Sequence, residues 1–169
     1  MTYDAEVSAA VAQALNLYGI AVEPALVHAV IERETRHGAL NLNGTLEPDG
    51  HYSYGPMQVK DTTGAMHGVS DAKSMAVPSI GIRIGTYELA RLLKLFPGDT
   101  ARAVAAYNAG SGNAARNAAG KFVNQSYVDA VLGFWNQYRG PLAVAGAAGV
   151  SLVALLFLLL AVFRRRAGR

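Results

Sequence analysis

Apolar residues recur at spacings of three and four along several stretches of the chain, which is the pattern of amphipathic helices. Five helices are predicted in this way, over residues 3–18, 24–37, 78–96, 100–108 and 125–138. Pro24 and Pro78 suit the first turn of a helix, and Asp99 or Thr100 would cap the fourth helix. Gly19, Gly38 and Gly110 stand where helices commonly end.

Two stretches lack this periodicity. Residues 38–56 are rich in Gly, Asn and Pro, and residues 108–122 are rich in Gly, Ala and Asn. Neither contains a strong strand signal, so both are predicted to be irregular loops. A long loop in a small domain is often functional. The sequence therefore predicts a compact all-α domain with candidate functional loops.

A third pattern is continuous rather than periodic. Residues 142–163 read LAVAGAAGVSLVALLFLLLAVF and carry no charge. Twenty-two residues in a helix extend about 33 Å, which matches the hydrocarbon thickness of a bilayer. A buried core helix is the alternative, but such a helix seldom lacks a polar stripe over this length. We expect residues 1–139 to form the folded domain and residues 140–169 to form a C-terminal transmembrane anchor with a basic tail.

Charge and composition exclude several classes of function. The chain has 15 basic and 12 acidic residues, but four of the basic residues are arginines that follow Phe163. Residues 1–141 therefore carry 11 basic and 12 acidic groups, a net charge of −1, which makes nucleic acid an improbable partner. There is no cysteine, so disulfides and thiolate chemistry are excluded. The first residues include Asp4 and Glu6 and do not resemble a secretory signal peptide.

Two glutamates near the end of the second predicted helix differ in their surroundings. At 100° per residue, Glu34 lies about 20° from Val27 and about 40° from Val30, so it emerges at the end of the apolar face. Glu32 lies about 200° from Glu34, on a face with His28 that we expect to be solvated. Burial against aliphatic side chains raises a carboxyl pKa, as a general acid requires. Glu34 is therefore the candidate acid, although on pattern alone a glutamate in this place more often caps a loop or pairs with an arginine.

Three motifs follow one another in the order found in a known family. The helix AVIERETRHG, with Glu34-Thr35, is followed by GPMQ at residues 55–58 and by AYNAG at residues 106–110. These motifs resemble those of the lytic transglycosylases of the lysozyme superfamily, over about residues 20–135. The resemblance implies a lysozyme-like helical fold and cleavage of peptidoglycan between N-acetylmuramic acid and N-acetylglucosamine.

The resemblance also implies roles for individual residues. Glu34 would be the catalytic acid, and Thr35, Gln58, Tyr107 and Asn108 would bind substrate or line the cleft. The product would carry an anhydro ring, formed when the muramic acid C6 hydroxyl closes on the anomeric carbon without water. Thr35 and the proline at position 56 depart from the family's serine and leucine, and the proline removes a backbone N–H donor. No cofactor and no metal are implied, and the four histidines show no metal-binding spacing.

Hydrolysis of the lysozyme type is the alternative reaction, and it needs a second carboxylate to activate water. Glu47 and Asp49 are the candidates, although EPDG at residues 47–50 is also ordinary turn chemistry. His51, Tyr52 and Tyr54 in the same loop are weaker candidates for substrate contact. A non-catalytic peptidoglycan-binding membrane protein is the alternative outside enzymology.

The expected partners are peptidoglycan glycan strands and a lipid membrane crossed once by residues 142–163. The expected location is a bacterial cell envelope or a virion membrane, with virion or secretion-apparatus proteins as candidate partners. Four arginines follow the apolar segment, so the positive-inside rule places the C-terminus in the cytoplasm or its equivalent.

Overall fold

The computed structural model describes residues 3–140. The predicted transmembrane segment, residues 142–163, and the arginine tail lie outside the described residues. Within the described part of the chain, no helix is both long enough and apolar enough to cross a membrane.

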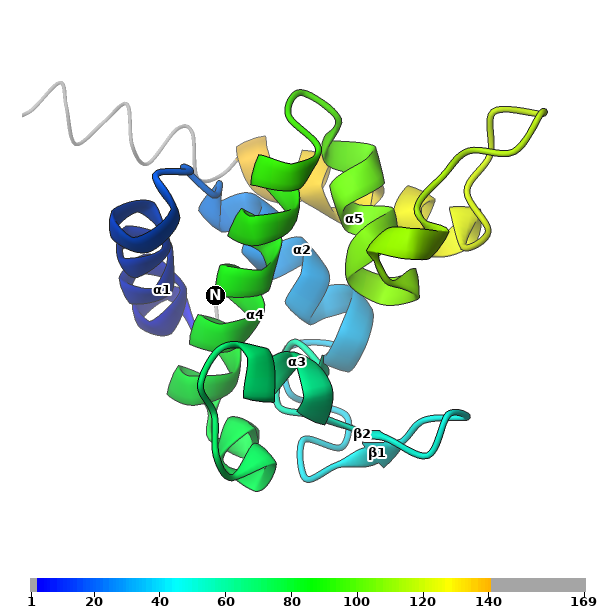
Figure 1. The fold of residues 1–169 in the computed structure, drawn as a ribbon. Coiled ribbons are helices and arrows are strands. Elements are labelled where there is room, and N and C mark those ends of the chain that lie inside the picture. Colours follow the sequence, from blue (N-terminus) through cyan, green and yellow to red (C-terminus); the bar gives the residue numbers. More distant parts are fainter. Residues whose placement is uncertain (1–2, 141–169) are drawn as a thin grey trace, which may run out of the picture.

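The five predicted helices are confirmed, with ends shifted by a few residues (Figure 1). They are α1 (Asp4–Tyr18), α2 (Pro24–Thr35), α4 (Pro78–Leu95), α5 (Thr100–Ala109) and a last helix over residues 125–140. The Asp99 carboxylate accepts a hydrogen bond from the backbone N–H of Arg102 at 3.0 Å and so caps α5. Gly19 and Gly110 end α1 and α5, as expected from their freedom to adopt positive φ.

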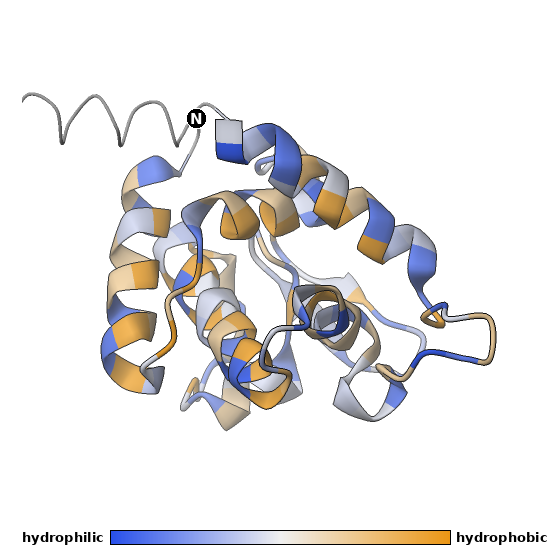
Figure 2. Cartoon of the chain, turned by 90° about the horizontal axis from the view of Figure 1, so that it is seen from above, coloured by the Kyte–Doolittle hydropathy of each residue, from blue (hydrophilic) through white to orange (hydrophobic). Residues whose placement is uncertain are grey.

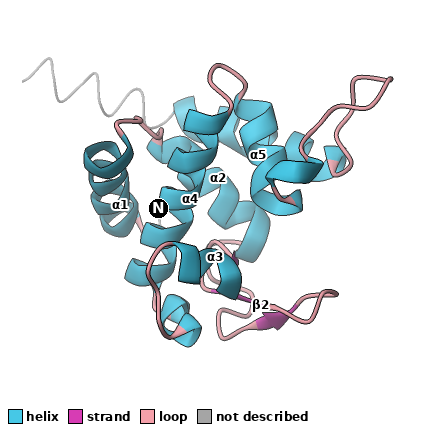
Figure 3. Cartoon of the chain, viewed as in Figure 1, coloured by secondary structure: helices cyan, strands magenta, loops and turns pink. Residues whose placement is uncertain are grey.

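The prediction that residues 38–56 are wholly irregular is wrong. A three-stranded antiparallel sheet, in the order β1-β2-β3, occupies part of this region and the residues after it (Figure 3). Its strands are β1 (Thr45–Leu46), β2 (Tyr52–Tyr54) and β3 (Val59–Lys60), and Leu46 pairs with Tyr52 while Tyr54 pairs with Val59. Strands of two or three residues are too short to show an alternating pattern. Three further short helices were not predicted: α3 (Asp61–Met66), η1 (Ala72–Ala76) and η2 (Ser111–Asn113).

Helix α2 lies at the centre of the domain and is buried on all sides from Ala25 to Ile31. The prediction of a solvated face is therefore wrong at His28, whereas the Glu32 side chain is 26% exposed. The His28 ring is 1% exposed and bonds to Asp4 Oδ1 at 3.1 Å and to His37 Nε2 at 3.3 Å. Glu32 Oε2 lies 2.6 Å from His37 Nδ1. Polar groups can be buried in this way because each finds a hydrogen-bond partner.

Helix α4 packs against α1 and α5 and supports the sheet side of the domain. Gly85 faces the point where β3 and α5 approach α4. A Cβ at Gly85 would lie 2.6 Å from Met57 Sδ and 2.9 Å from Tyr107 Oη, so only glycine allows this packing. Met57 is fully buried there, which places its neighbour Gln58 at the surface of the core.

Candidate active site

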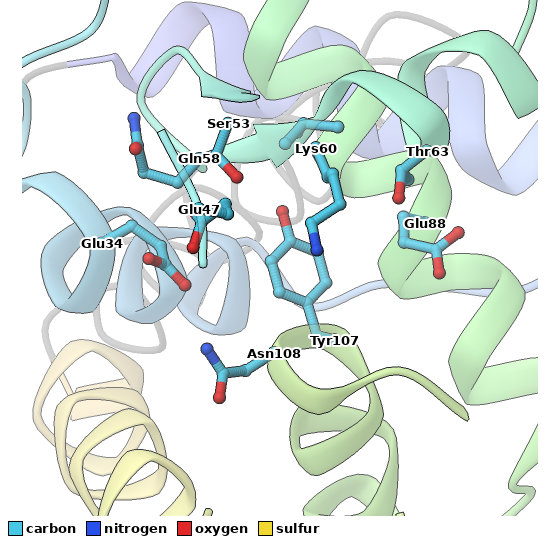
Figure 4. Close-up of a pocket in the computed structure, with 10 residues that line it drawn as sticks. Glu34, Glu47, Ser53, Gln58, Lys60, Thr63, Glu88, Tyr107 and Asn108 are labelled. Atoms are coloured by element: carbon cyan, nitrogen blue, oxygen red, sulfur yellow. The ribbon is translucent and has the colours of Figure 1, made fainter. Parts of the chain in front are cut away.

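An open pocket lies where the end of α2, the sheet, α4 and the end of α5 meet (Figure 4). It encloses about 520 Å³, its open mouth included. Its walls are formed by Glu34, Glu47, Ser53, Gln58, Val59, Lys60, Thr63, Glu88, Tyr107 and Asn108. Four of the five residues predicted for the site are therefore brought together, although they are separated by up to 74 positions in the sequence.

Glu34 stands in the last turn of α2, with its carboxyl group directed into the pocket (Figure 4). Burial raises the pKa of this carboxyl to about 7, although a hydrogen bond from Tyr127 and the positive charge of Arg33 lower it in part. The negative charge of Glu47 raises it slightly further. A glutamate with this pKa exchanges a proton near neutral pH, which is what a group that serves as acid and then as base requires.

Tyr127 is a site residue that the sequence motifs did not single out. It lies in the helix over residues 125–140, is 4% exposed, and its hydroxyl donates a 2.6 Å hydrogen bond to Glu34 Oε1. The Arg33 guanidinium lies 5.2 Å from the centre of the Tyr127 ring. The sequence does offer one indication that Tyr127 has a bonded hydroxyl, since a tyrosine on the apolar face of a core helix usually needs a partner for its hydroxyl. The identity of that partner could not be read from the sequence.

Gln58 is held in an unusual backbone conformation at the pocket wall. Its φ is +43°, and its side-chain Nε2 donates to Gly55 O at 2.9 Å and to Asn41 O at 3.2 Å. Both amide hydrogens are thereby used to hold the loop. The side-chain carbonyl oxygen is the atom left to accept a hydrogen bond in the pocket.

Tyr107 and Asn108 come from the last turn of α5. The Tyr107 hydroxyl donates a 2.9 Å hydrogen bond to Met57 O, which fixes the ring across the pocket. Burial raises the Tyr107 pKa well above its ordinary value, so the phenol stays neutral. The Asn108 side-chain oxygen accepts a 2.9 Å bond from Asn124 Nδ2, which ties α5 to the start of the last helix.

Thr35 does not line the pocket, contrary to the expectation that it binds substrate. Its side chain is fully buried, and its hydroxyl bonds to Pro56 O at 2.8 Å and to Ile31 O at 3.2 Å. The hydroxyl also accepts a 3.2 Å bond from the backbone N–H of Gly38. Thr35 therefore joins the end of α2 to the loop before Gln58. The residue acts on the site by positioning, because substrate cannot reach a side chain that is fully buried.

The other candidates in the loop separate into two groups. Glu47 lines the pocket, whereas Asp49 lies outside it and forms an ion pair with Lys60 at 2.7 Å. His51 also lies outside the lining and pairs with Asp61 at 3.0 Å. Tyr52 and Tyr54 stack on each other with ring centres 6.2 Å apart, away from the pocket lining.

Glu88 at the far side of the pocket was not predicted. It is 8% exposed, accepts two bonds from Arg91 at 2.7 and 2.8 Å, and lies 3.0 Å from His67 Nε2. Burial alone would raise the pKa of Glu88, but the hydrogen bonds from Arg91 and His67 outweigh burial and hold it below the ordinary value. Glu88 is therefore an anion near neutral pH and lacks the proton that an acid must give. Within residues 3–140, no three His, Cys, Asp or Glu side chains are grouped so that they could hold a metal ion.

Comparisons with known proteins bear on the fold and the family of the domain. The structure is similar to an inactive mutant of lytic transglycosylase Slt from Pseudomonas aeruginosa, with a TM-score of 0.59 and 21% sequence identity. The match covers 80% of this chain but only 24% of that protein, so this chain spans about a quarter of its length. At this identity the likeness concerns the mostly helical, lysozyme-like fold. Residues 13–127, more than half of the chain, match the family described as Transglycosylase SLT domain, and the chain therefore belongs to this family.

Proposed function

We propose that this protein is a lytic transglycosylase that cleaves the β-1,4 bond between N-acetylmuramic acid and N-acetylglucosamine in peptidoglycan. The observation that carries the proposal is the Glu34 carboxyl, with a pKa of about 7, at the wall of an open pocket. The similar Pseudomonas aeruginosa structure is that of an inactive mutant with glutamine in place of a glutamate, which supports a reaction that requires a glutamate carboxyl group.

The proposed reaction uses Glu34 twice. The neutral carboxyl first gives its proton to the glycosidic oxygen, and the bond from that oxygen to the muramic acid anomeric carbon breaks. The substrate's own acetamido group stabilises the positive charge that develops on this carbon. The Glu34 carboxylate then takes the proton of the C6 hydroxyl, whose oxygen bonds to the anomeric carbon and closes the anhydro ring. Glu34 ends protonated, and no water is consumed.

The surrounding residues supply orientation. The Tyr127 hydroxyl holds Glu34 Oε1 at 2.6 Å, so the carboxyl cannot turn away as its charge changes. The same bond stabilises the carboxylate formed after the first proton transfer. Gln58, Tyr107 and Asn108 line the pocket and would bind the sugar rings or their acetamido groups. Acid and base assistance of this kind contributes roughly 10²–10⁴-fold to a rate.

Hydrolysis is the second candidate reaction, and one observation favours it. Glu47 lines the same pocket as Glu34 and lies close enough to influence its pKa. A second carboxylate in that place could activate a water molecule. Asp49 does not share this position, because it is paired with Lys60.

The mass of the released sugar distinguishes the two reactions. The protein is incubated with purified peptidoglycan, and the soluble muropeptides are analysed by mass spectrometry. We expect anhydro-muramic ends, which are lighter than hydrolysed ends by one water. Glu34→Gln should lose nearly all activity, whereas Glu47→Gln should keep most of it. Reducing ends together with an inactive Glu47→Gln variant would establish hydrolysis instead. An intact fold with no activity in the wild type would favour a peptidoglycan-binding protein.

We further propose that residues 142–163 anchor the domain in a membrane of a cell envelope or virion, with the arginine tail on the cytoplasmic side. The support is the uncharged stretch of 22 residues followed by four arginines. Protease added outside intact spheroplasts or virus particles should digest the domain and spare an epitope placed after Arg169. Loss of the epitope with survival of the domain would show the reverse orientation.

A further inference from the structure

The short distance in sequence between the folded domain and the proposed anchor restricts how the domain can be placed on a membrane. The last helix is described as far as residue 140, and the apolar segment begins at Leu142. Two residues span at most about 7 Å. If the proposed anchor is correct, residue 140 must lie at the level of the lipid headgroups. The inference that follows rests on that anchor.

The last described turn of the final helix contacts Glu23, the residue before α2. Arg139 Nε lies 3.1 Å from Glu23 Oε2, and Trp135 Nε1 donates a 3.1 Å bond to the same carboxylate. The Arg139 guanidinium also lies 4.5 Å from the centre of the Trp135 ring. Tryptophan and arginine are the side chains that commonly occupy the interface between water and lipid. The contacts of Arg139 and Trp135 with Glu23 therefore bring the N-terminal end of α2 to the membrane together with residue 140.

The last turns of α1 and α4 lie side by side near this end of the molecule (Figure 1). Lys94 Nζ donates a 3.3 Å bond to Tyr18 O, which joins the two helix ends. The large apolar side chains exposed in these turns include Leu17 at 62% and Leu95 at 49%. Figure 2 views the molecule from above Figure 1, coloured by the hydropathy of each residue.

We propose that these residues form a lipid-facing surface, the anchor-side face, defined as Leu17, Lys94, Leu95 and Arg139. Its leucines enter the boundary between headgroups and acyl chains, and Lys94 meets anionic headgroups. Arg139 is partly neutralised by Glu23 and contributes mainly through its position. Apolar side chains beside basic ones are the combination that binds proteins to the surface of a bilayer.

This placement determines which part of the substrate the enzyme reaches. Glu23 precedes α2, and Glu34 stands in its last turn. A helix of 12 residues is about 18 Å long, so the pocket lies about this distance along α2 from the anchor-side face. The enzyme would therefore act on glycan strands close to the membrane rather than throughout the wall.

The absence of cysteine from the chain permits a clean test. The full chain carrying Leu17→Cys or Leu95→Cys is labelled with an environment-sensitive fluorophore and reconstituted in vesicles of phosphatidylcholine and phosphatidylglycerol. Leu46→Cys is the matched control, because Leu46 is 61% exposed and lies in β1 beside the pocket. Lipids with a spin label near the headgroup should quench the probes at 17 and 95 several-fold more strongly than the probe at 46.

Flotation of the same vesicles tests the anchor separately. Protein that floats while all three probes are quenched equally, or while only the probe at 46 is quenched, would overturn the anchor-side face and leave the anchor intact. Protein that floats with no quenching at any of the three positions would also overturn the anchor-side face and leave the anchor intact. Protein that fails to float would refute the anchor and with it this inference. None of these outcomes depends on whether the enzyme makes anhydro or hydrolysed products.

Discussion

Replacing Glu34 by glutamine should stabilise the fold at high pH and have much less effect at low pH. Burial raises the pKa of Glu34 from 4.5 to about 7. Between these values the folded protein holds a proton that the unfolded chain releases, so the stability of the wild type falls as the pH rises through this interval. Below about pH 4.5 the carboxyl is neutral in both states and carries no such penalty.

The size of the effect follows from the shift. One pKa unit corresponds to about 1.4 kcal/mol, so a rise from 4.5 to about 7 corresponds to about 3 kcal/mol of folding free energy lost by pH 8. Partial exposure of Glu34 to solvent reduces this loss of folding free energy, and we expect a loss of about 2–3 kcal/mol. Glutamine has no charge and retains an oxygen that can accept the bond from Tyr127. The difference between Glu34→Gln and the wild type should therefore grow by about 2–3 kcal/mol between pH 4.5 and pH 8.

Urea unfolding of the full chain in mild detergent, followed by circular dichroism, measures this difference. Glu32→Gln is the matched control, since it makes the same change two residues earlier in α2. That carboxylate lies 2.6 Å from His37, so its replacement removes a favourable contact and should not stabilise the protein at pH 8. A stability difference for Glu34→Gln that is the same at both pH values would refute the assignment of a raised pKa to Glu34.

Three further predictions concern the site. Glu32→Gln should retain cleavage of peptidoglycan close to the wild-type rate, because its side chain does not line the pocket; a loss as large as that of Glu34→Gln would contradict the assignment. Tyr127→Phe removes a bond that lowers the Glu34 pKa, so the high-pH limb of the rate profile should move upward by about one unit, and a downward movement would contradict this reasoning. Thr35→Val leaves the buried Pro56 carbonyl without its hydroxyl partner and should cost about 1–3 kcal/mol in urea unfolding; unchanged stability would show that the bond contributes little.

The sequence by itself determined the helices and the family. Helical periodicity is a local property, and Asp99, Gly19 and Gly110 act within a few residues of themselves, so helix positions and caps could be predicted. The three motifs likewise placed Glu34 at the end of α2 and gathered Gln58 and Tyr107 into one site. The short strands were missed because their stability comes from pairing with one another, which no single segment reveals.

Tertiary structure alone decided the environment of each site residue. The face of α2 that carries His28 was expected to be solvated, but α1 supplies Asp4 and the loop supplies His37, so His28 is buried. Thr35 was expected at the substrate, but its hydroxyl is used by Pro56.

The pKa of Glu34 depends in the same way on groups that are distant in the sequence. Tyr127 reaches it across 93 positions, and Glu47 adds its charge from the loop after β1. Burial and electrostatic fields are properties of the whole packed arrangement, because they depend on which segments exclude water from a group and which charges lie near it. A linear pattern can name the residue that holds the proton, but only the packing around that residue determines the pH at which the proton leaves.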